Sequence, residues 1–204
     1  MGYSLGGGAC SAAIMGLTTI LLAPWQAHAQ WAFHCPEAGT VVTYELAGKM
    51  NTVSYEGADP TNGELCVRSV NGQRGRMFFG MVGMGNANAV DLTSAYREVL
   101  SGPHGKRAQT SNYGPTGVVS LVHEFRNEGV DILEIGGERR QIVRIADTQT
   151  TFGRGALQLT WRFSFDLQTG AVLRVLFQQD AGHRPAYVPA DTDWTATSIK
   201  VPKP

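Results

Sequence analysis

The sequence predicts a mainly β protein: a single antiparallel meander curled into a barrel or half-barrel, with one short helix at about residues 91–100. Apolar and polar residues alternate almost without a break through residues 157–167, as in a half-buried strand. Shorter runs rich in β-branched and aromatic residues recur between glycine-containing turns. One segment carries apolar residues at helical spacing.

The clearest predicted element is a hairpin over residues 155–179. A three-residue loop at 168–170, with Gly170 in the left-handed region, keeps the apolar residues of both strands on the same face and is therefore favoured. A two- or four-residue loop would place Phe163 opposite Arg174 and mix the two faces, so the pattern selects the register. The predicted pairs are Leu167 with Ala171, Phe165 with Leu173, Phe163 with Val175 and Trp161 with Phe177.

Residues 1–29 are predicted to be a signal peptide. The apolar run at 12–23 is too short for a membrane span, and residues 27–29 have the small-x-small form of a cleavage site. No Lys or Arg precedes this run, which departs from the usual pattern. We expect a periplasmic or secreted protein with one β-rich domain at 30–204, whose residues 181–204 lie as a tail over the surface.

Basic and acidic residues balance, with 17 of each. A balanced chain with scattered arginines is not typical of proteins that bind nucleic acid. No second long apolar segment follows the leader, so we expect no transmembrane segment after cleavage.

Cys35 and Cys66 are the two cysteines that follow the leader. In an oxidising compartment such a pair most simply forms a disulfide. In the chain-entropy model, closing a loop of about thirty residues stabilises the fold by about 3 to 4 kcal/mol. The spacing does not favour a redox-active pair, and no His or carboxylate cluster near either cysteine suggests a metal site.

The first half of the domain is expected to consist of hairpins. Strands at 40–46 and 52–56 flank a turn at 47–49, and strands at 65–70 and 76–82 flank Asn71 and Gly72, a pair typical of type I′ turns. Residues 57–63 are dense in turn formers and are predicted to be a surface loop. The glycines of residues 80–88 indicate a bend or bulge more than a phosphate-binding loop.

In the second half, the helix at 91–100 is predicted to have Asp91 as its N-cap. Residues 102–117 are predicted to be a long polar loop. A meander is expected to follow, with turns at 127–129 and 136–137, a strand at 139–148 and a connector at 152–155. Residues 194–201 are expected to form an edge strand.

Four apolar side chains are candidates for binding an apolar ligand. Met77 and Met81 lie on the glycine-rich strand, over which such a ligand could pass. Trp161 and Phe163 belong to the inward face of the hairpin. The alternative is that these residues only fill the core.

Four arginines are candidates for binding an anionic head group. Arg140 and Arg144 share one face of a strand, and Arg162 and Arg174 lie on the polar face of the hairpin. If these faces are continuous, the guanidinium groups could grip carboxylate or phosphate bidentately. The alternative is a solvated outer face, balanced by Asp147, Asp166 and Glu138.

The sequence offers little for catalysis, and no cofactor or metal is predicted. The histidines at 34, 104, 123 and 183 do not have a metal-ligand spacing, and no nucleophile motif is present. His123 shares the parity of an apolar strand face, which favours a core residue with a satisfied ring. A hydrolase with His104 near a carboxylate in the 102–117 loop is a weakly supported alternative.

The leader, the CPEAGT start, the disulfide pair and the closing FDLQTGAVLR segment together resemble uncharacterised secreted proteins of Gram-negative bacteria. The meander also resembles the half-barrels that handle lipids and lipoproteins in the periplasm. This resemblance spans mainly residues 118–179 and assigns no site residue.

No motif identifies a function. We favour a non-enzymatic cell-envelope protein that binds an apolar or amphipathic ligand, such as a lipid or apolar small molecule. The alternatives are an interaction or structural protein that binds another envelope protein through an exposed edge or its tail, and the hydrolase.

Overall fold

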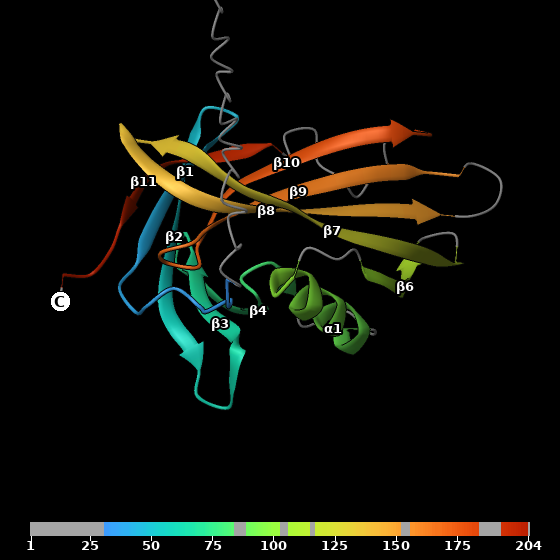
Figure 1. The fold of residues 1–204 in the computed structure, drawn as a ribbon, viewed down its shortest axis with the longest axis horizontal. Coiled ribbons are helices and arrows are strands. Elements are labelled where there is room, and N and C mark those ends of the chain that lie inside the picture. Colours follow the sequence, from blue (N-terminus) through green and yellow to red (C-terminus); the bar gives the residue numbers. More distant parts are fainter. Residues whose placement is uncertain are drawn as a thin grey trace, which may run out of the picture.

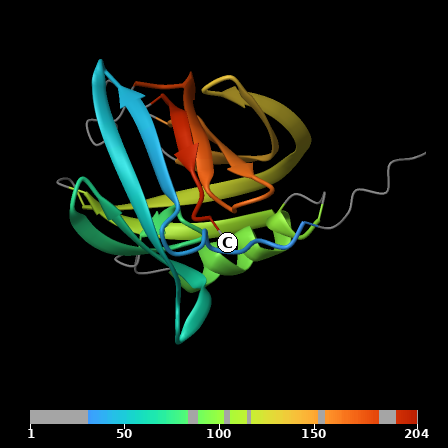
Figure 2. The ribbon, with the colours of Figure 1, turned by 90° about the vertical axis from the view of Figure 1, so that its left-hand side faces the viewer.

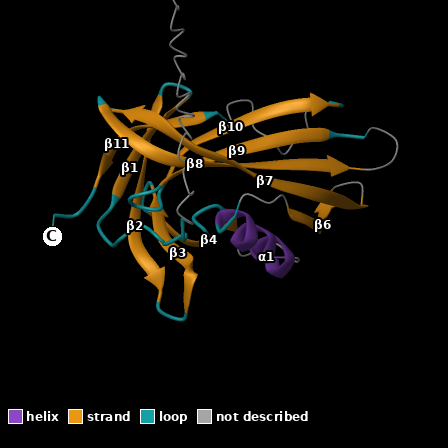
Figure 3. Ribbon diagram, in the orientation of Figure 1, coloured by secondary structure: helices purple, strands orange, loops and turns teal. Residues whose placement is uncertain are grey.

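The computed structural model describes residues 31–83, 89–102, 106–114, 117–151, 156–183 and 193–203. They form one 11-stranded antiparallel sheet and one α-helix (Figure 1; Figure 3). The strand order is β5-β4-β3-β2-β1-β11-β10-β9-β8-β7-β6. The end strands β5 and β6 do not pair with each other within the described residues. The sheet is therefore a curled half-barrel, which confirms the predicted fold class.

The first five strands follow one another in space. They are β1 (Val41–Leu46), β2 (Lys49–Asp59), β3 (Asn62–Val70), β4 (Gln73–Phe78) and β5 (Val82–Gly83). The turn predicted at Asn71 and Gly72 is confirmed, with φ of 48° and 86°. The surface loop predicted at 57–63 is wrong, because β2 and β3 continue into a tight turn. Asp59 closes this turn by accepting hydrogen bonds from the Thr61 amide at 2.9 Å and the Thr61 hydroxyl at 2.5 Å.

The return strand predicted at 76–82 is interrupted. Phe79 and Gly80 have φ of 51° and 69°, so the chain bends after β4 and pairs again only in the short β5. This agrees with the bend predicted for the glycine-rich segment, whose residues 84–88 lie outside the described chain.

The predicted helix is confirmed as α1 (Ala89–Leu100). Asp91 lies in its first turn and not at the N-cap, because the helix begins two residues earlier. The polar loop predicted at 102–117 is wrong, since β6 (Lys106–Gly114) pairs with β7 along its whole length. An edge strand needs main-chain partners more than buried side chains, so a polar sequence can form one.

The turn predicted at 127–129 is also wrong. β7 (Gly117–Ile135) continues through it as a bulge, in which the Gly129 amide donates to Asn127 Oδ1 at 2.8 Å and Gly129 has a φ of 94°. The turn predicted at 136–137 is confirmed and leads into β8 (Glu138–Thr151). The predicted connector at 152–155 lies outside the described residues.

The final hairpin consists of β9 (Gln158–Asp166) and β10 (Val172–Ala181). The predicted pairs Phe163 with Val175 and Trp161 with Phe177 are confirmed. Near the loop the prediction is wrong: Phe165 pairs with Val172, because a bulge shifts the register between Val172 and Arg174.

Residues 194–200 form β11 (Trp194–Lys200), which pairs with both β1 and β10. The predicted edge position is therefore wrong, and this part of the C-terminal segment is an interior strand. A pairing between residues so far apart in sequence leaves no local signal.

The curled sheet buries apolar side chains on both faces. On the concave face a main core, including Phe79, Phe125 and Phe165, packs against α1 (Figure 2). A second core, including Val42, Leu133 and Leu173, forms where the ends of β7 and β8 fold toward β11. Leu133 comes from the reverse face of β7, whereas Val42 lies on the same side of the sheet as Trp194 of the main core.

The disulfide between Cys35 and Cys66 is present and ties the segment before β1 to β3. Its cysteines are 31 residues apart.

Replacing both cysteines by serine should lower the free energy of unfolding by about 3 to 4 kcal/mol, because the unfolded chain regains the entropy of the open loop. Urea unfolding of the oxidised protein and of the double variant measures this difference. An unchanged transition midpoint would contradict the expectation.

Candidate functional site

A group of large apolar side chains borders the main core without being fully covered. We call it the concave aromatic surface; it comprises Trp31, Phe33, Met81, Trp161 and Phe163, which pack against the main core, and Phe177, which packs against Trp161. The Trp161 and Phe177 rings meet edge to face, with centroids 4.9 Å apart on adjacent strands. The structure thus brings together three of the predicted ligand residues, Met81, Trp161 and Phe163, around one core.

The first described residues complete this surface. The Phe33 ring lies edge to face on Phe79 at 5.2 Å and on Phe165 at 6.0 Å, and Trp31 lies 5.8 Å from Phe165. Sequence reasoning missed these two residues, although a Trp-Ala-Phe run directly after a predicted cleavage site was a usable signal.

Met77 lies elsewhere. It pairs with Cys66 across β3 and β4, and its thioether accepts a hydrogen bond from the Arg68 guanidinium. This contact places it beside the disulfide and apart from the other predicted apolar ligand residues.

A polar group lies buried on the concave face. His123 Nδ1 is 3.0 Å and 3.1 Å from the two carboxylate oxygens of Asp147, which also accepts from Gln149 Nε2 at 2.8 Å. The side chains of His123 and Asp147 are only 6% and 4% exposed, and the His123 ring stacks on Phe125. The pair joins β7 to β8 in a place closed to solvent, as expected for a core histidine.

Tyr96 of α1 lies in the same region. Burial, and to a smaller extent the nearby Asp147 carboxylate, hold the pKa of the Tyr96 phenol well above its ordinary value.

This raised pKa predicts a loss of stability at alkaline pH. Below about pH 10 the phenol is protonated in both the folded and the unfolded protein, so its contribution to the free energy of unfolding is fully present. Above this pH the phenol ionises in the unfolded protein but stays protonated in the folded protein, so this contribution is lost. The Tyr96→Phe variant should therefore lose less stability between about pH 9 and pH 11 than the unmodified protein. Urea unfolding across this range tests it; equal losses would contradict it.

Three of the four predicted arginines lie together on the opposite face of the sheet. Arg144 and Arg174 flank Ser164 in one cross-strand row, with Arg162 in the next row. All are engaged by neighbouring side chains: Arg144 with Asp131 at 3.0 Å, Arg162 with Glu128 at 3.2 Å and Arg174 with the Thr195 hydroxyl at 3.0 Å. This face is therefore balanced by Glu128 and Asp131, and not by the predicted Asp147, which lies on the concave face.

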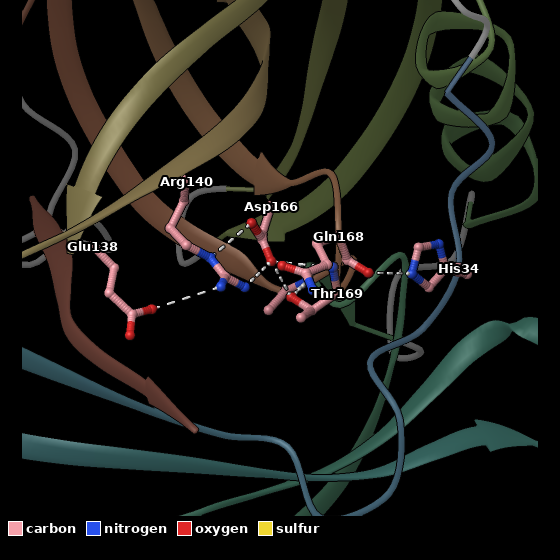
Figure 4. A network of polar contacts seen from close by, with 7 residues as sticks. His34, Glu138, Arg140, Asp166, Gln168 and Thr169 are labelled. Carbon is pink, nitrogen blue, oxygen red and sulfur yellow. Dashed lines mark hydrogen bonds and ion pairs between the residues drawn. The ribbon is translucent and has the colours of Figure 1, made fainter. Parts of the chain in front are cut away.

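Arg140 is held by Asp166 at the end of β9 (Figure 4). The guanidinium donates to both carboxylate oxygens, at 2.8 Å and 3.3 Å, and Oδ2 also accepts from the amide and hydroxyl of Thr169 at 3.1 Å and 2.6 Å. Gly170 follows in the left-handed region, and a Cβ there would lie 1.9 Å from the His34 carbonyl oxygen. The network thus fixes the β9–β10 loop against the N-terminal segment.

An open pocket of about 350 Å³ adjoins this network. It lies beside the start of β8 and the end of β9. Its lining residues are Arg139, Arg140, Gln141, Asp166, Leu167 and Gln168. Arg140 Nη1 has a longer contact of 3.9 Å with the exposed Glu138. The Asp166 carboxylate already accepts hydrogen bonds from Arg140 and Thr169. We therefore interpret this pocket as a polar depression of the protein surface.

The Arg140→Met variant should lower the free energy of unfolding by about 3 kcal/mol or more, because it leaves the Asp166 carboxylate buried without its cation. The neighbouring Arg139 is exposed, so Arg139→Met should change stability by less than about 0.5 kcal/mol. Urea unfolding of the pair compares them directly. Similar effects of the two substitutions would show that the network is not stabilising.

Within the described ranges, no group of three His, Cys, Asp or Glu side chains is placed to hold a metal ion. Among the same residues, no helix has the length and apolar character needed to cross a membrane. His104 of the hydrolase hypothesis lies outside the described residues.

Comparison with known proteins identifies no family. No family model and no curated protein matches the chain. Among solved structures, the hypothetical lipoprotein YmcC from Escherichia coli (K12) is similar, with 14% sequence identity and a TM-score of 0.47 over 81% of this chain and 85% of that chain. This likeness is too low to support an argument about function.

Proposed function

We propose that this chain is a non-enzymatic cell-envelope protein that holds an apolar or amphipathic ligand against the concave aromatic surface. The observation that carries the proposal is the half-buried state of Trp161, Phe163 and Phe177 on an unclosed sheet. Aromatic side chains contribute most when the rest of their surface is removed from water. A ligand lying along β9 and β10 would supply that cover.

The chemistry of this surface favours a ligand with an apolar body. Trp161 and Phe177 present ring edges and faces from adjacent strands, and Met81 adds a side chain that adapts to irregular shapes. Gln179 follows Phe177 by two residues on the same strand; its Nε2 donates to the Gly182 carbonyl oxygen, so a polar end of the ligand would find the Oε1 acceptor beside the rings.

A non-enzymatic role agrees with the burial of the polar groups on this face. The His123 and Asp147 side chains are closed to solvent, so a ligand on the aromatic surface would not reach them. A carrier or holding protein requires only shape and apolar contact.

The disulfide favours an oxidising compartment, which agrees with the expected leader. We therefore propose the periplasm or the outside of the cell as the place of action.

Binding of 1-N-phenylnaphthylamine, a dye that fluoresces in apolar surroundings, tests the proposal. The Phe177→Gln variant should bind the dye about tenfold more weakly, since it removes one side of the aromatic pair. Met50→Gln is the matched control, because Met50 is 58% exposed on the β1–β2 hairpin, away from this surface.

Energy transfer from tryptophan to the bound dye provides a second readout that does not depend on a variant. Efficient transfer together with weaker binding only in Phe177→Gln supports the proposal. Equal binding by both variants, or binding without energy transfer, would place the dye elsewhere and contradict it.

A further inference from the structure

Arg68 of β3 is a half-buried cation that forms no ion pair within the described residues. Its guanidinium donates a hydrogen bond to the Met77 thioether, which is a weak acceptor. The carboxylates of β2 and β3 are paired with other arginines: Glu56 with Arg74, Asp59 with Arg76 and Glu64 with Arg97. Charges that are removed from water are usually paired, so an anion from outside the described chain would be stabilised beside Arg68.

Arg68 lies in a cross-strand row that becomes more buried from β4 to β2. Gly75 of β4 is opposite Arg68, and Arg68 is opposite Tyr55 of β2. Residues directly opposite each other in antiparallel strands point to the same face of the sheet. Gly75 is exposed, and a Cβ at this position would meet nothing within 4 Å, whereas Tyr55 is only 2% exposed. The row is therefore open at its β4 end and closed at its β2 end.

The Tyr55 hydroxyl is a second polar group of this row that lacks a partner. Its oxygen is buried and makes no hydrogen bond within the part of the chain that the structure describes. Burial raises the pKa of the Tyr55 phenol, and the nearby Arg68 guanidinium opposes this shift. The Tyr44 hydroxyl already donates to the Val172 carbonyl oxygen at 2.6 Å. A buried hydroxyl without a partner is costly, so an acceptor atom beside Tyr55 would be stabilised.

A guanidinium and a hydroxyl donor in one row favour an oxyanion as the ligand, and the local charge favours a carboxylate. The guanidinium fork matches a carboxylate with two parallel hydrogen bonds. A carboxylate carries a single negative charge, which neutralises Arg68. A phosphate monoester carries a charge of about −1.5 to −2 at pH 7 and would leave excess negative charge in a half-buried place.

We propose that Arg68 and Tyr55 bind a carboxylate group, which belongs either to a small organic acid or to the head of an amphipathic molecule. The carboxylate replaces the Met77 thioether as the acceptor for the guanidinium and also accepts a hydrogen bond from the Tyr55 hydroxyl. The adaptable Met77 side chain then packs against the adjoining carbon atoms of the ligand. This site shares no residue with the concave aromatic surface and does not rest on the ligand proposed there.

NMR titration of the full chain, labelled with 15N and secreted to the periplasm of a bacterial host, tests the proposal. The arginine Nε–H signal that is missing from the Arg68→Met variant belongs to Arg68. Sodium butyrate at millimolar concentration should shift this signal to saturation, whereas sodium chloride at the same ionic strength should not.

Sodium decanoate distinguishes the two sources of the carboxylate. Equal affinity for butyrate and decanoate at the Arg68 signal would indicate a small organic acid. Tighter binding of decanoate, or binding of decanoate alone, would indicate the head of an amphipathic molecule. Either result agrees with the proposed site.

Two variants and a control show which side chains hold the carboxylate, with saturation transfer to the acid as the readout. Tyr55→Phe should bind about fivefold more weakly, and it should fold because the hydroxyl that it removes has no partner among the described residues. Arg68→Met should bind at least about tenfold more weakly. Arg139→Met removes an exposed arginine of another strand and should leave binding unchanged.

Four results would overturn the proposal. A shift of the Arg68 signal by neither acid would exclude a carboxylate site. An equal shift in sodium chloride would show only the screening of charge. Binding of inorganic phosphate as tight as that of the carboxylic acids would contradict the chosen ligand class. An unchanged affinity in Tyr55→Phe would show that the hydroxyl does not contact the ligand.

Discussion

The pairing of β11 between β1 and β10 is the interaction on which the rest of the structure depends. It joins residues 195–200 to β1 on one side and residues 194–195 to β10 on the other, so that two runs of hairpins become one sheet. Without it, β1 to β5 and β6 to β10 would be separate sheets, each with an exposed inner edge. The Trp194 ring packs against Tyr44 at 4.4 Å and borders both cores, which fixes the seam from the inside.

Once the sheet is continuous, its curvature places the candidate sites. Bulges at Asn127 to Gly129 and at Val172 to Arg174 bend long strands without ending them. The concave side collects α1 and the aromatic residues, while the far ends of β7 and β8 fold toward β11. The apolar and arginine groups considered from sequence therefore lie on different faces and cannot act on one ligand together.

The sequence predicted those features that depend on side chains close together in the chain. The alternation around Trp161 and Phe163 fixed their pairing with Phe177 and Val175, and Asn71 with Gly72 gave a turn because both residues tolerate positive φ. It failed where main-chain pairing decides the structure. β6 has few apolar residues, and the bulge at Asn127 has the composition of a turn. The position of β11 depends on its pairing with β1, which lies more than a hundred residues earlier in the sequence.

The candidate site was predictable only in part. Arg140 and Asp166 were both named as members of one charged face, and they pair across β8 and β9. Asp147 was named with them but points to the opposite face, toward His123, because residues 147 and 144 differ in parity. The contribution of Trp31 and Phe33 was predictable only in part: their run after the predicted cleavage site indicates an apolar segment, but nothing in an isolated aromatic pair states which core it will meet.

The central claim, that the concave aromatic surface holds a ligand, is tested most directly by native mass spectrometry of the protein secreted to the periplasm, before and after denaturation. The account predicts a mass excess in the native protein that is lost on denaturing and reduced in Phe177→Gln, with the released molecule being apolar or amphipathic. A native mass equal to that of the oxidised chain alone, after gentle purification without detergent, would contradict it.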